Sequence, residues 1–180
     1  MSAELPQGWC SARIGELCHL TNGRAFKPSD WSATGLPIVR IQNLNNEEAP
    51  FNHYAGEVAP KFLIENGELL FAWSGTPGTS FGAHIWSGPK AVLNQHIFKV
   101  EFPSGAIDKT YLRHAINQKL QYLIGLAHGG VGLRHVTKGK FEGTEIPLPP
   151  YAEQRRIVAR LDRLFERTRR AREELSHLPR

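Results

Sequence analysis

The chain has 180 residues, of which 41% are hydrophobic and 22% charged, and it carries a formal net charge of +5 with a pI near 9.4. This composition excludes a disordered chain and predicts one globular domain with an appended element, while 17 glycines and 12 prolines predict many turns. Because the sequence has neither a long apolar run nor a signal-peptide pattern, we expect a cytoplasmic protein. The basic excess favours a polyanionic partner.

Short apolar runs bounded by Gly, Pro or Asn predict strands within the first 150 residues. The first is GLPIVRIQNLNN, residues 35–46, in which Val39 and Ile41 alternate with polar residues. Four further runs are GELLFAWSG (67–75), GAHIWSG (82–88), KAVLNQ (90–95) and HIFKVEF (96–102). These runs predict a strand-rich core.

Residues 108–130 contrast with these runs and predict one helix. Asp108 is suited to cap its start, and Gly129 with Gly130 ends it. The apolar stripe of this helix is Leu112, Ile116, Leu120, Leu123 and Leu126. Strands together with this helix predict an α+β fold for residues 1–150.

A second unit is predicted from residue 151 to residue 180. The chain has no glycine after Gly143, and two consecutive prolines, Pro149 and Pro150, mark a boundary. Nine arginines and five acidic residues follow them. A proline suits the first turn of a helix, and Glu153 lies where the helix dipole favours an acid. We therefore expect a long C-terminal helix of coiled-coil type.

Apolar or small residues recur in this helix at alternating spacings of four and three, which is a heptad pattern. They are Ile157, Leu161, Leu164, Thr168, Ala171, Leu175 and Leu178. Such a narrow stripe favours pairing with another helix over folding back on the same domain, which is the alternative interpretation. Because so many arginines repel one another, we expect the helix to need a packing partner.

The stretch Pro149-Pro150-Tyr151 resembles the catalytic loop of DNA methyltransferases that act on amino groups. That chemistry needs an Asp or Asn immediately before the prolines, whereas Leu148 stands there, and no glycine-rich strand-to-helix loop precedes it. We therefore interpret the prolines as the end of one domain and the start of a helix. No residue is assigned a catalytic role.

No metal or nucleophile site is predicted either. Cys10 and Cys18 have no second pair to complete a zinc site, and the eight histidines are scattered. Ser74 and Ser80 lack the frame of a nucleophile elbow. We expect this chain to bind no metal or cofactor.

The predicted turns instead carry side chains that are suited to reading base edges. Arg and Lys pair with guanine, Asn and Gln pair with adenine, and Ser and Thr pair with either. The candidate DNA-binding residues are Arg24, Lys27, Arg40, Gln42, Asn43, Ser74, Thr76, Thr79, Asn94, Gln95, His96, Arg134, His135 and Lys138. Polar residues populate most loops, so this pattern alone leaves DNA binding open.

Seven short motifs occur along the chain in this order: LPQGW, IGELCHLTNG, GLPIVRIQNLN, NGELLFAWSGTPGT, LNQHIFKV, GGVGLRHVTKGKFEGTEIPLPP and AEQRRIVARLD. Together they resemble a specificity subunit of a type I restriction-modification enzyme over nearly the whole chain. The most specific part is IPLPPYAEQRRIVARLD, where a target recognition domain of that family ends and its spacer helix begins.

The resemblance implies a target recognition domain at residues 1–150 that reads one half of a split site in double-stranded DNA. It also implies a spacer helix at residues 151–180 that packs antiparallel to a second one. Chemistry is then expected on partners: modification subunits that bind S-adenosylmethionine, and restriction subunits that use ATP and Mg. A complete member resembles two such units, so this chain is expected to be a fragment or a half-subunit that forms a homodimer. A stand-alone DNA-binding regulator and an adenine-N6 DNA methyltransferase stay open as alternatives.

Overall fold

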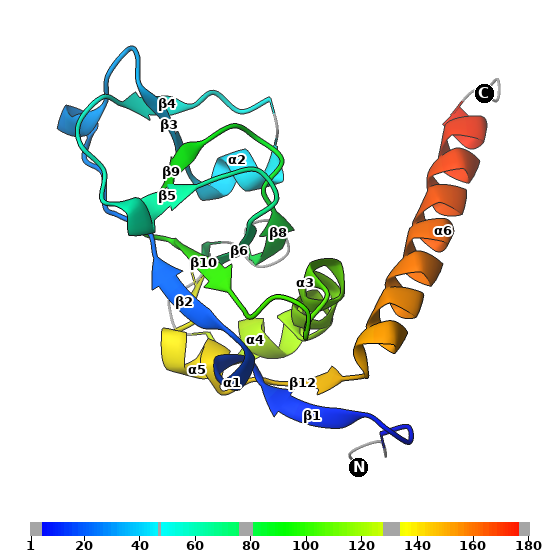
Figure 1. Ribbon diagram of the computed structural model, residues 1–180. Helices are drawn as coiled ribbons and strands as arrows, with labels where there is room; N and C mark the ends of the chain where they lie inside the picture. Colours follow the sequence, from blue (N-terminus) through cyan, green and yellow to red (C-terminus); the bar gives the residue numbers. More distant parts are fainter. Residues whose placement is uncertain (1–4, 47, 76–80, 128–133, 177–180) are drawn as a thin grey trace.

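A computed structural model describes residues 5–46, 48–75, 81–127 and 134–176. It confirms the α+β fold: a domain of short strands and helices is followed by one long helix that leaves it (Figure 1). None of the helices in the described part of the chain is both long and apolar enough to cross a membrane.

The strands form small sheets that are antiparallel with one exception. The central sheet has the order β2 (His19–Asn22), β10 (Ile97–Glu101), β6 (Leu69–Ala72) and β8 (Gly82–Ile85). A second sheet has the order β4 (Asn52–Tyr54), β3 (Leu36–Val39), β9 (Ala91–Leu93) and β5 (Leu63–Ile64), in which β3 and β9 run parallel. Two ribbons complete the set: β1 (Cys10–Arg13) with β12 (Glu145–Leu148), and β7 (Ser74–Gly75) with β11 (Arg134–His135).

Strand β6 separates two apolar cores, because successive side chains of a strand point to opposite faces. Leu69 and Phe71 pack into the larger core, beneath the helices, whereas Leu70 packs into the smaller one with Val39 and Trp86. All four residues of β6 are buried, which explains why it reads as a continuous apolar run. The runs at 67–75, 82–88, 90–95 and 96–102 each contain a strand, as predicted.

The helices cover the larger core and one edge of the smaller one (Figure 1). They are α1 (Ile14–Leu17), α2 (Ile41–Asn45), α3 (Lys109–Gln118), α4 (Leu120–Leu126), α5 (Lys138–Glu142) and α6 (Tyr151–Ser176), with short 3₁₀ turns η1 (Pro28–Asp30) and η2 (Pro60–Phe62). The Asp108 carboxylate caps α3 as predicted, accepting a hydrogen bond from the backbone N of Tyr111 over 2.9 Å.

Two expectations about these elements were wrong. The strand expected through Ile41 stops at Val39, and α2 begins at Ile41, because the Asn43 side chain accepts from the backbone N of Arg40 over 3.0 Å. The single helix expected at 108–130 is divided at Lys119, whose backbone N donates to Ile116 O, three residues back, over 3.0 Å. Gly129 and Gly130 lie outside the described residues.

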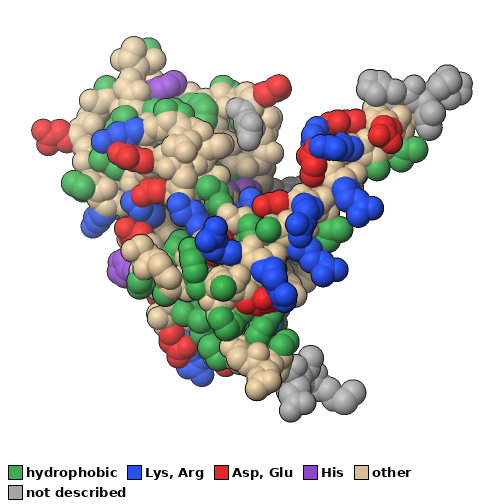
Figure 2. Space-filling view, turned by 45° about the vertical axis from the view of Figure 1, so that its right-hand side comes forward, with side chains coloured by type: hydrophobic (Ala, Val, Ile, Leu, Met, Phe, Trp, Pro, Cys, Tyr) green, Lys and Arg blue, Asp and Glu red, His purple; other side chains and the backbone are tan. Residues whose placement is uncertain are grey.

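Helix α6 begins at Tyr151, directly after the two prolines, as predicted. Its first turns contact the domain, whereas every residue from Arg167 to Ser176 is exposed. The space-filling view shows this outer half standing clear of the domain (Figure 2). The division into residues 1–150 and 151–180 stays a prediction.

Candidate nucleic-acid interface

A pocket of about 240 Å³ brings together five of the candidate DNA-binding residues. They come from the two segments that follow the parallel strands β3 and β9, and they are Arg40, Gln42, Asn94, Gln95 and His96. Ile38 pairs with Val92, and the backbone N of Asn94 donates to Val39 O over 3.0 Å. Adjacent parallel strands end at the same edge of a sheet, and ligands bind there in many α/β folds.

A glycine allows the third segment of the pocket to approach these two. An added Cβ at Gly23 would lie 2.1 Å from Asn94 O, so a larger residue there would force the two backbones apart. The next residue, Arg24, donates its backbone N–H to Leu93 O over 2.8 Å. Phe26 and Trp31, which follow Arg24 in the chain, contribute aromatic rings to the lining of the pocket.

Two polar atoms at the pocket have no hydrogen-bond partner among the described residues. They are Gln95 Oε1 and His96 Nδ1, and both are buried. The Gln95 Nε2 and His96 Nε2 atoms lie 3.3 Å apart. Burial, with His135 nearby, lowers the pKa of His96 below its ordinary value, so its ring is neutral at pH 7 and has one donor and one acceptor.

Aromatic contacts connect the pocket to the β7–β11 ribbon. The ring of Trp73 lies 5.2 Å from that of His96 and 5.8 Å from that of His135, measured between centroids. Ser74 Oγ lies 2.8 Å from His135 Nδ1, and Ser74 itself is buried. The candidates Ser74, His96 and His135 therefore belong to one cluster.

Other candidates are occupied inside the fold. Asn43 is 3% exposed, and its amide donates to Ala49 O and Pro50 O over 3.1 and 3.3 Å. The guanidinium of Arg24 donates to the Tyr54 hydroxyl over 3.1 Å and lies 4.6 Å from that ring's centroid. The Lys138 ammonium donates to Leu20 O over 3.1 Å. These contacts stabilise the fold, and a DNA contact by any of these residues stays a prediction.

The remaining candidates are less informative. Lys27 is exposed at the start of η1. Arg134 pairs through its backbone with Gly75. Thr76 and Thr79 lie outside the described residues.

Sequence reasoning missed the aromatic residues of this region. Phe26 and Trp31 line the pocket, and Trp73 joins it to His135. Trp31 is 43% exposed although it is large and apolar. A tryptophan within the polar, proline-containing stretch GRAFKPSDW is a local signal that points to an exposed aromatic side chain.

The root of α6 is held to the domain by one buried amide. Gln154 is 1% exposed, its Oε1 accepts from the backbone N of Asp108 over 2.8 Å, and its Nε2 donates to Pro149 O over 2.9 Å. On the same side, the Tyr111 hydroxyl donates to Pro147 O over 2.7 Å. Leu148 pairs with Cys10 in the β1–β12 ribbon, so the residue before the two prolines serves the fold.

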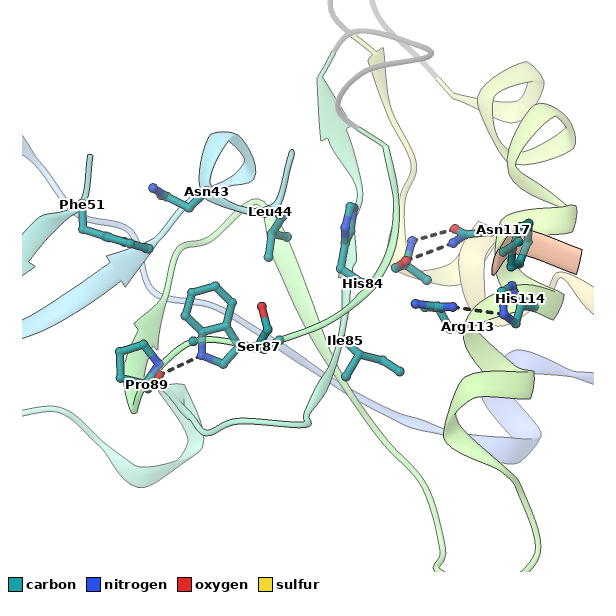
Figure 3. A pocket seen from close by; sticks show the side chains of 14 residues that line it. Asn43, Leu44, Phe51, His84, Ile85, Ser87, Pro89, Arg113, His114 and Asn117 are labelled. Atoms are coloured by element: carbon teal, nitrogen blue, oxygen red, sulfur yellow. Dashed lines mark hydrogen bonds between the residues drawn. The ribbon is translucent and has the colours of Figure 1, made fainter. Parts of the chain in front are cut away.

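A larger cleft of about 670 Å³ lies where α3 and the middle of α6 meet β8 and α2. Asn117 anchors its floor, because its side chain both accepts from Ala83 N over 2.8 Å and donates to Ala83 O over 3.0 Å (Figure 3). Arg113 and His114 lie beside this anchor, and the His114 ring stacks on Phe165 of α6 at 5.7 Å. The contact between His114 and Phe165 thus joins α6 to the domain beside this cleft.

The heptad residues of α6 divide into two groups. Ile157 and Leu161 are half-buried and turn toward the domain beside Tyr111, so here the fold-back alternative holds. Leu164 and Leu175 are 48% and 67% exposed, and Thr168 and Ala171 are exposed between them. Leu178 lies outside the described residues. Only the outer half of the stripe is available to a partner helix.

Ion pairs explain how α6 tolerates its arginines. Glu166 pairs with Arg169 and Arg170, and Arg169 also pairs with Glu173. These spacings of three and four residues place opposite charges together on a helix. Arg160, Arg163 and Arg167 form no ion pair with a described residue, and Figure 2 shows basic side chains along this helix.

Within the described ranges, no three side chains of His, Cys, Asp or Glu gather in a way that fits a metal ion. The absence of a metal or cofactor therefore stays an expectation.

The chain is similar in sequence to specificity subunits of type I restriction enzymes. The chain is 27% identical over 173 residues to the type I restriction enzyme EcoBI specificity subunit of Escherichia coli, and it covers 35% of that protein with 95% of its own length. It is 27% identical over 158 residues to the MjaVIII specificity subunit of Methanocaldococcus jannaschii, covering 35% of that protein with 86% of its own length. The chain thus spans about a third of these curated relatives.

The fold is shared with a solved structure, the HsdS subunit from Thermoanaerobacter tengcongensis, with a TM-score of 0.71 and 21% identity over 96% of this chain and 41% of that one. The family model of the type I restriction modification DNA specificity domain matches residues 6–178. The chain belongs to this family of DNA specificity domains.

Proposed function

We propose that this chain is a DNA-recognition module of a type I restriction-modification system, which reads one half of a split DNA site. The observation that carries the proposal is the pocket at the ends of β3 and β9, where five base-reading candidates meet in a member of the DNA specificity family. Its partners are then double-stranded DNA, modification subunits and restriction subunits.

The proposal assigns no catalytic step to this chain. Leu148 replaces the Asp or Asn that an amino-group methyltransferase needs, and its strand pairing with Cys10 leaves it in the fold. S-adenosylmethionine, ATP and Mg belong on the partner subunits. Calorimetry of the chain with S-adenosylmethionine should show no binding, and stoichiometric tight binding would support an adenine methyltransferase instead.

The second part of the proposal concerns α6, whose exposed outer half pairs with the same segment of a second copy. An antiparallel arrangement that sets Leu164 against the partner copy's Leu175 also sets Thr168 against its Ala171. In this register Arg167 faces Glu174 of the other copy on both sides of the pair, so opposite charges flank the apolar contacts. Two identical recognition domains would then read a palindromic split site.

DNA binding tests the first part. In the complex with its copurifying subunits, Arg40→Ala or Gln95→Ala should weaken binding to the cognate sequence by about 1–3 kcal/mol if the side chain makes a bidentate base contact. Arg13→Ala and Gln121→Ala remove the same side-chain types at exposed positions outside the pocket, and should leave affinity unchanged. Equal affinities for all four variants would remove the pocket from the interface. Copurification of modification subunits separates this role from that of a stand-alone regulator.

A further inference from the structure

We propose that the pocket at the ends of β3 and β9 holds a single nucleobase turned out of the DNA double helix. This inference rests on the proposed function and deepens it, because it names the group that the pocket binds. A base that stays stacked in the duplex is covered on both faces by its neighbours and cannot enter a pocket.

The size of the pocket suits one base. Sites for drug-sized ligands occupy about 300–1,000 Å³, and one water molecule in the liquid takes about 30 Å³. A volume of about 240 Å³ therefore has room for a one- or two-ring heterocycle with little space to spare.

The walls supply surfaces on which a base can stack. Trp31 presents an exposed indole, and the Arg40 guanidinium lies 5.8 Å from its centroid. Phe26 is held edge-on by Tyr54 at 5.2 Å, so this second ring is also fixed in place. Stacking of a base on an aromatic side chain contributes about 1–3 kcal/mol and needs no particular sequence.

The polar residues of the lining supply groups that read the edge of a base. Gln42, Asn94, Gln95 and His96 line the pocket, and they offer both donors and acceptors. Gln95 Oε1 and His96 Nδ1 lack partners among the described residues, and leaving a buried polar atom unsatisfied costs about 1–3 kcal/mol. Both atoms belong to side chains that line the pocket.

The lining also matches the charge of a nucleotide. No Asp or Glu is among its residues, and Arg40 carries a positive charge at the pocket. A neutral heterocycle inside the pocket and a phosphate near Arg40 are therefore both compatible with it. A carboxylate in the lining would have repelled the DNA backbone.

A scan of single mismatches in the target duplex tests the inference, using the complex of the full chain with its copurifying subunits. A base that is already unpaired costs less to turn out of the helix. At one position of the half-site other than the methylated adenine, a mismatch should therefore strengthen binding by about tenfold, which corresponds to about 1.4 kcal/mol.

Two variants assign this gain to the pocket. Trp31→Ala should abolish it, and Tyr122→Ala, which removes another exposed aromatic ring outside the pocket, should preserve it. Because Trp31 is at the surface, its variant should fold, and its unfolding transition checks this. Weaker or unchanged binding at every mismatch overturns the inference, as does a gain that survives in Trp31→Ala. If the paired target is bound no better than a scrambled duplex, the proposed function fails with it, whereas preferential binding without a gain overturns the base pocket alone.

Discussion

The side chain of Gln154 in α6 accepts a hydrogen bond from the backbone N of Asp108, the residue that caps α3, over 2.8 Å. The same amide donates to Pro149 O, so one buried side chain joins the long helix, the proline junction and the preceding domain. The role proposed for α6, to set the position of one recognition domain relative to another, requires a rigid root. We infer that Gln154 provides this rigidity.

Gln154→Leu should lower the free energy of unfolding by about 3 kcal/mol, because the Asp108 N–H and the Pro149 carbonyl lose their partner and each unsatisfied group costs about 1–3 kcal/mol. Denaturant unfolding measures the change. Gln121→Leu makes the same replacement at an exposed position of α4, and should change stability by less than about 0.5 kcal/mol. Equal stabilities of the two variants would show that Gln154 does not hold the joint.

Asn43→Ala should destabilise the protein by about 1–3 kcal/mol, since Arg40 N, Ala49 O and Pro50 O lose a buried partner. Asn45→Ala changes an exposed residue of the same helix and is the matched control. Thermal or denaturant unfolding separates them. Full stability of Asn43→Ala, combined with loss of DNA binding, would instead assign Asn43 to direct base contact.

Acid should loosen the outer turns of α6. Hydrogen bonds from Arg169 and Arg170 lower the pKa of the Glu166 carboxyl from 4.5 to about 2. The pKa is lower in the folded state, so this contribution is present above pH 4.5 and is lost as the pH falls from 4.5 through about 2. Backbone NMR shifts of residues 166–173 should move toward random-coil values over that range.

Glu166→Gln lacks the titrating carboxyl, so the same amides should already be shifted at neutral pH and should change less on acidification. High salt should reduce the difference between the two proteins, because the pairs are exposed and salt screens them. Identical titrations of the two proteins would show that Glu166 does not support these turns.

The outer register of α6 can be tested by charge reversal. Arg167→Glu or Glu174→Arg alone should weaken self-association of the chain, because each places like charges opposite one another in the antiparallel pair. The two changes together should restore it, since opposite charges then face each other again. Sedimentation at low salt measures all four proteins, and a double variant that associates no better than either single one would reject this register.

Local patterns were sufficient for much of this fold. The strands β6, β8, β9 and β10 lie within apolar runs, and the cap at Asp108 and the prolines before Tyr151 mark helix starts through contacts with near neighbours. Helix α2 was missed although the contact of Asn43 with Arg40 N is local, because the alternation of Val39 and Ile41 with polar residues favours a strand over the same positions.

The pocket needed the tertiary fold. Its residues meet because β3 and β9 pair in parallel and because Gly23 lets the segment before Phe26 approach Asn94. No local pattern in the sequence predicts either contact. Likewise the heptad in α6 keeps the same repeat throughout, yet Leu161 lines a pocket with Tyr111 while Leu164 is exposed, because the domain contacts the face of α6 that carries Ile157, Leu161 and Phe165.

Mapping of methylated adenines in cells tests the central claim most directly. Deleting the gene should abolish methylation of one split sequence motif, and restoring the wild-type chain should return it. Gln95→Ala should lower methylation of that motif or relax it at one position, while Gln121→Ala should behave as wild type. An unchanged set of methylated adenines in the deletion strain would contradict the assignment of this chain as the module that reads DNA.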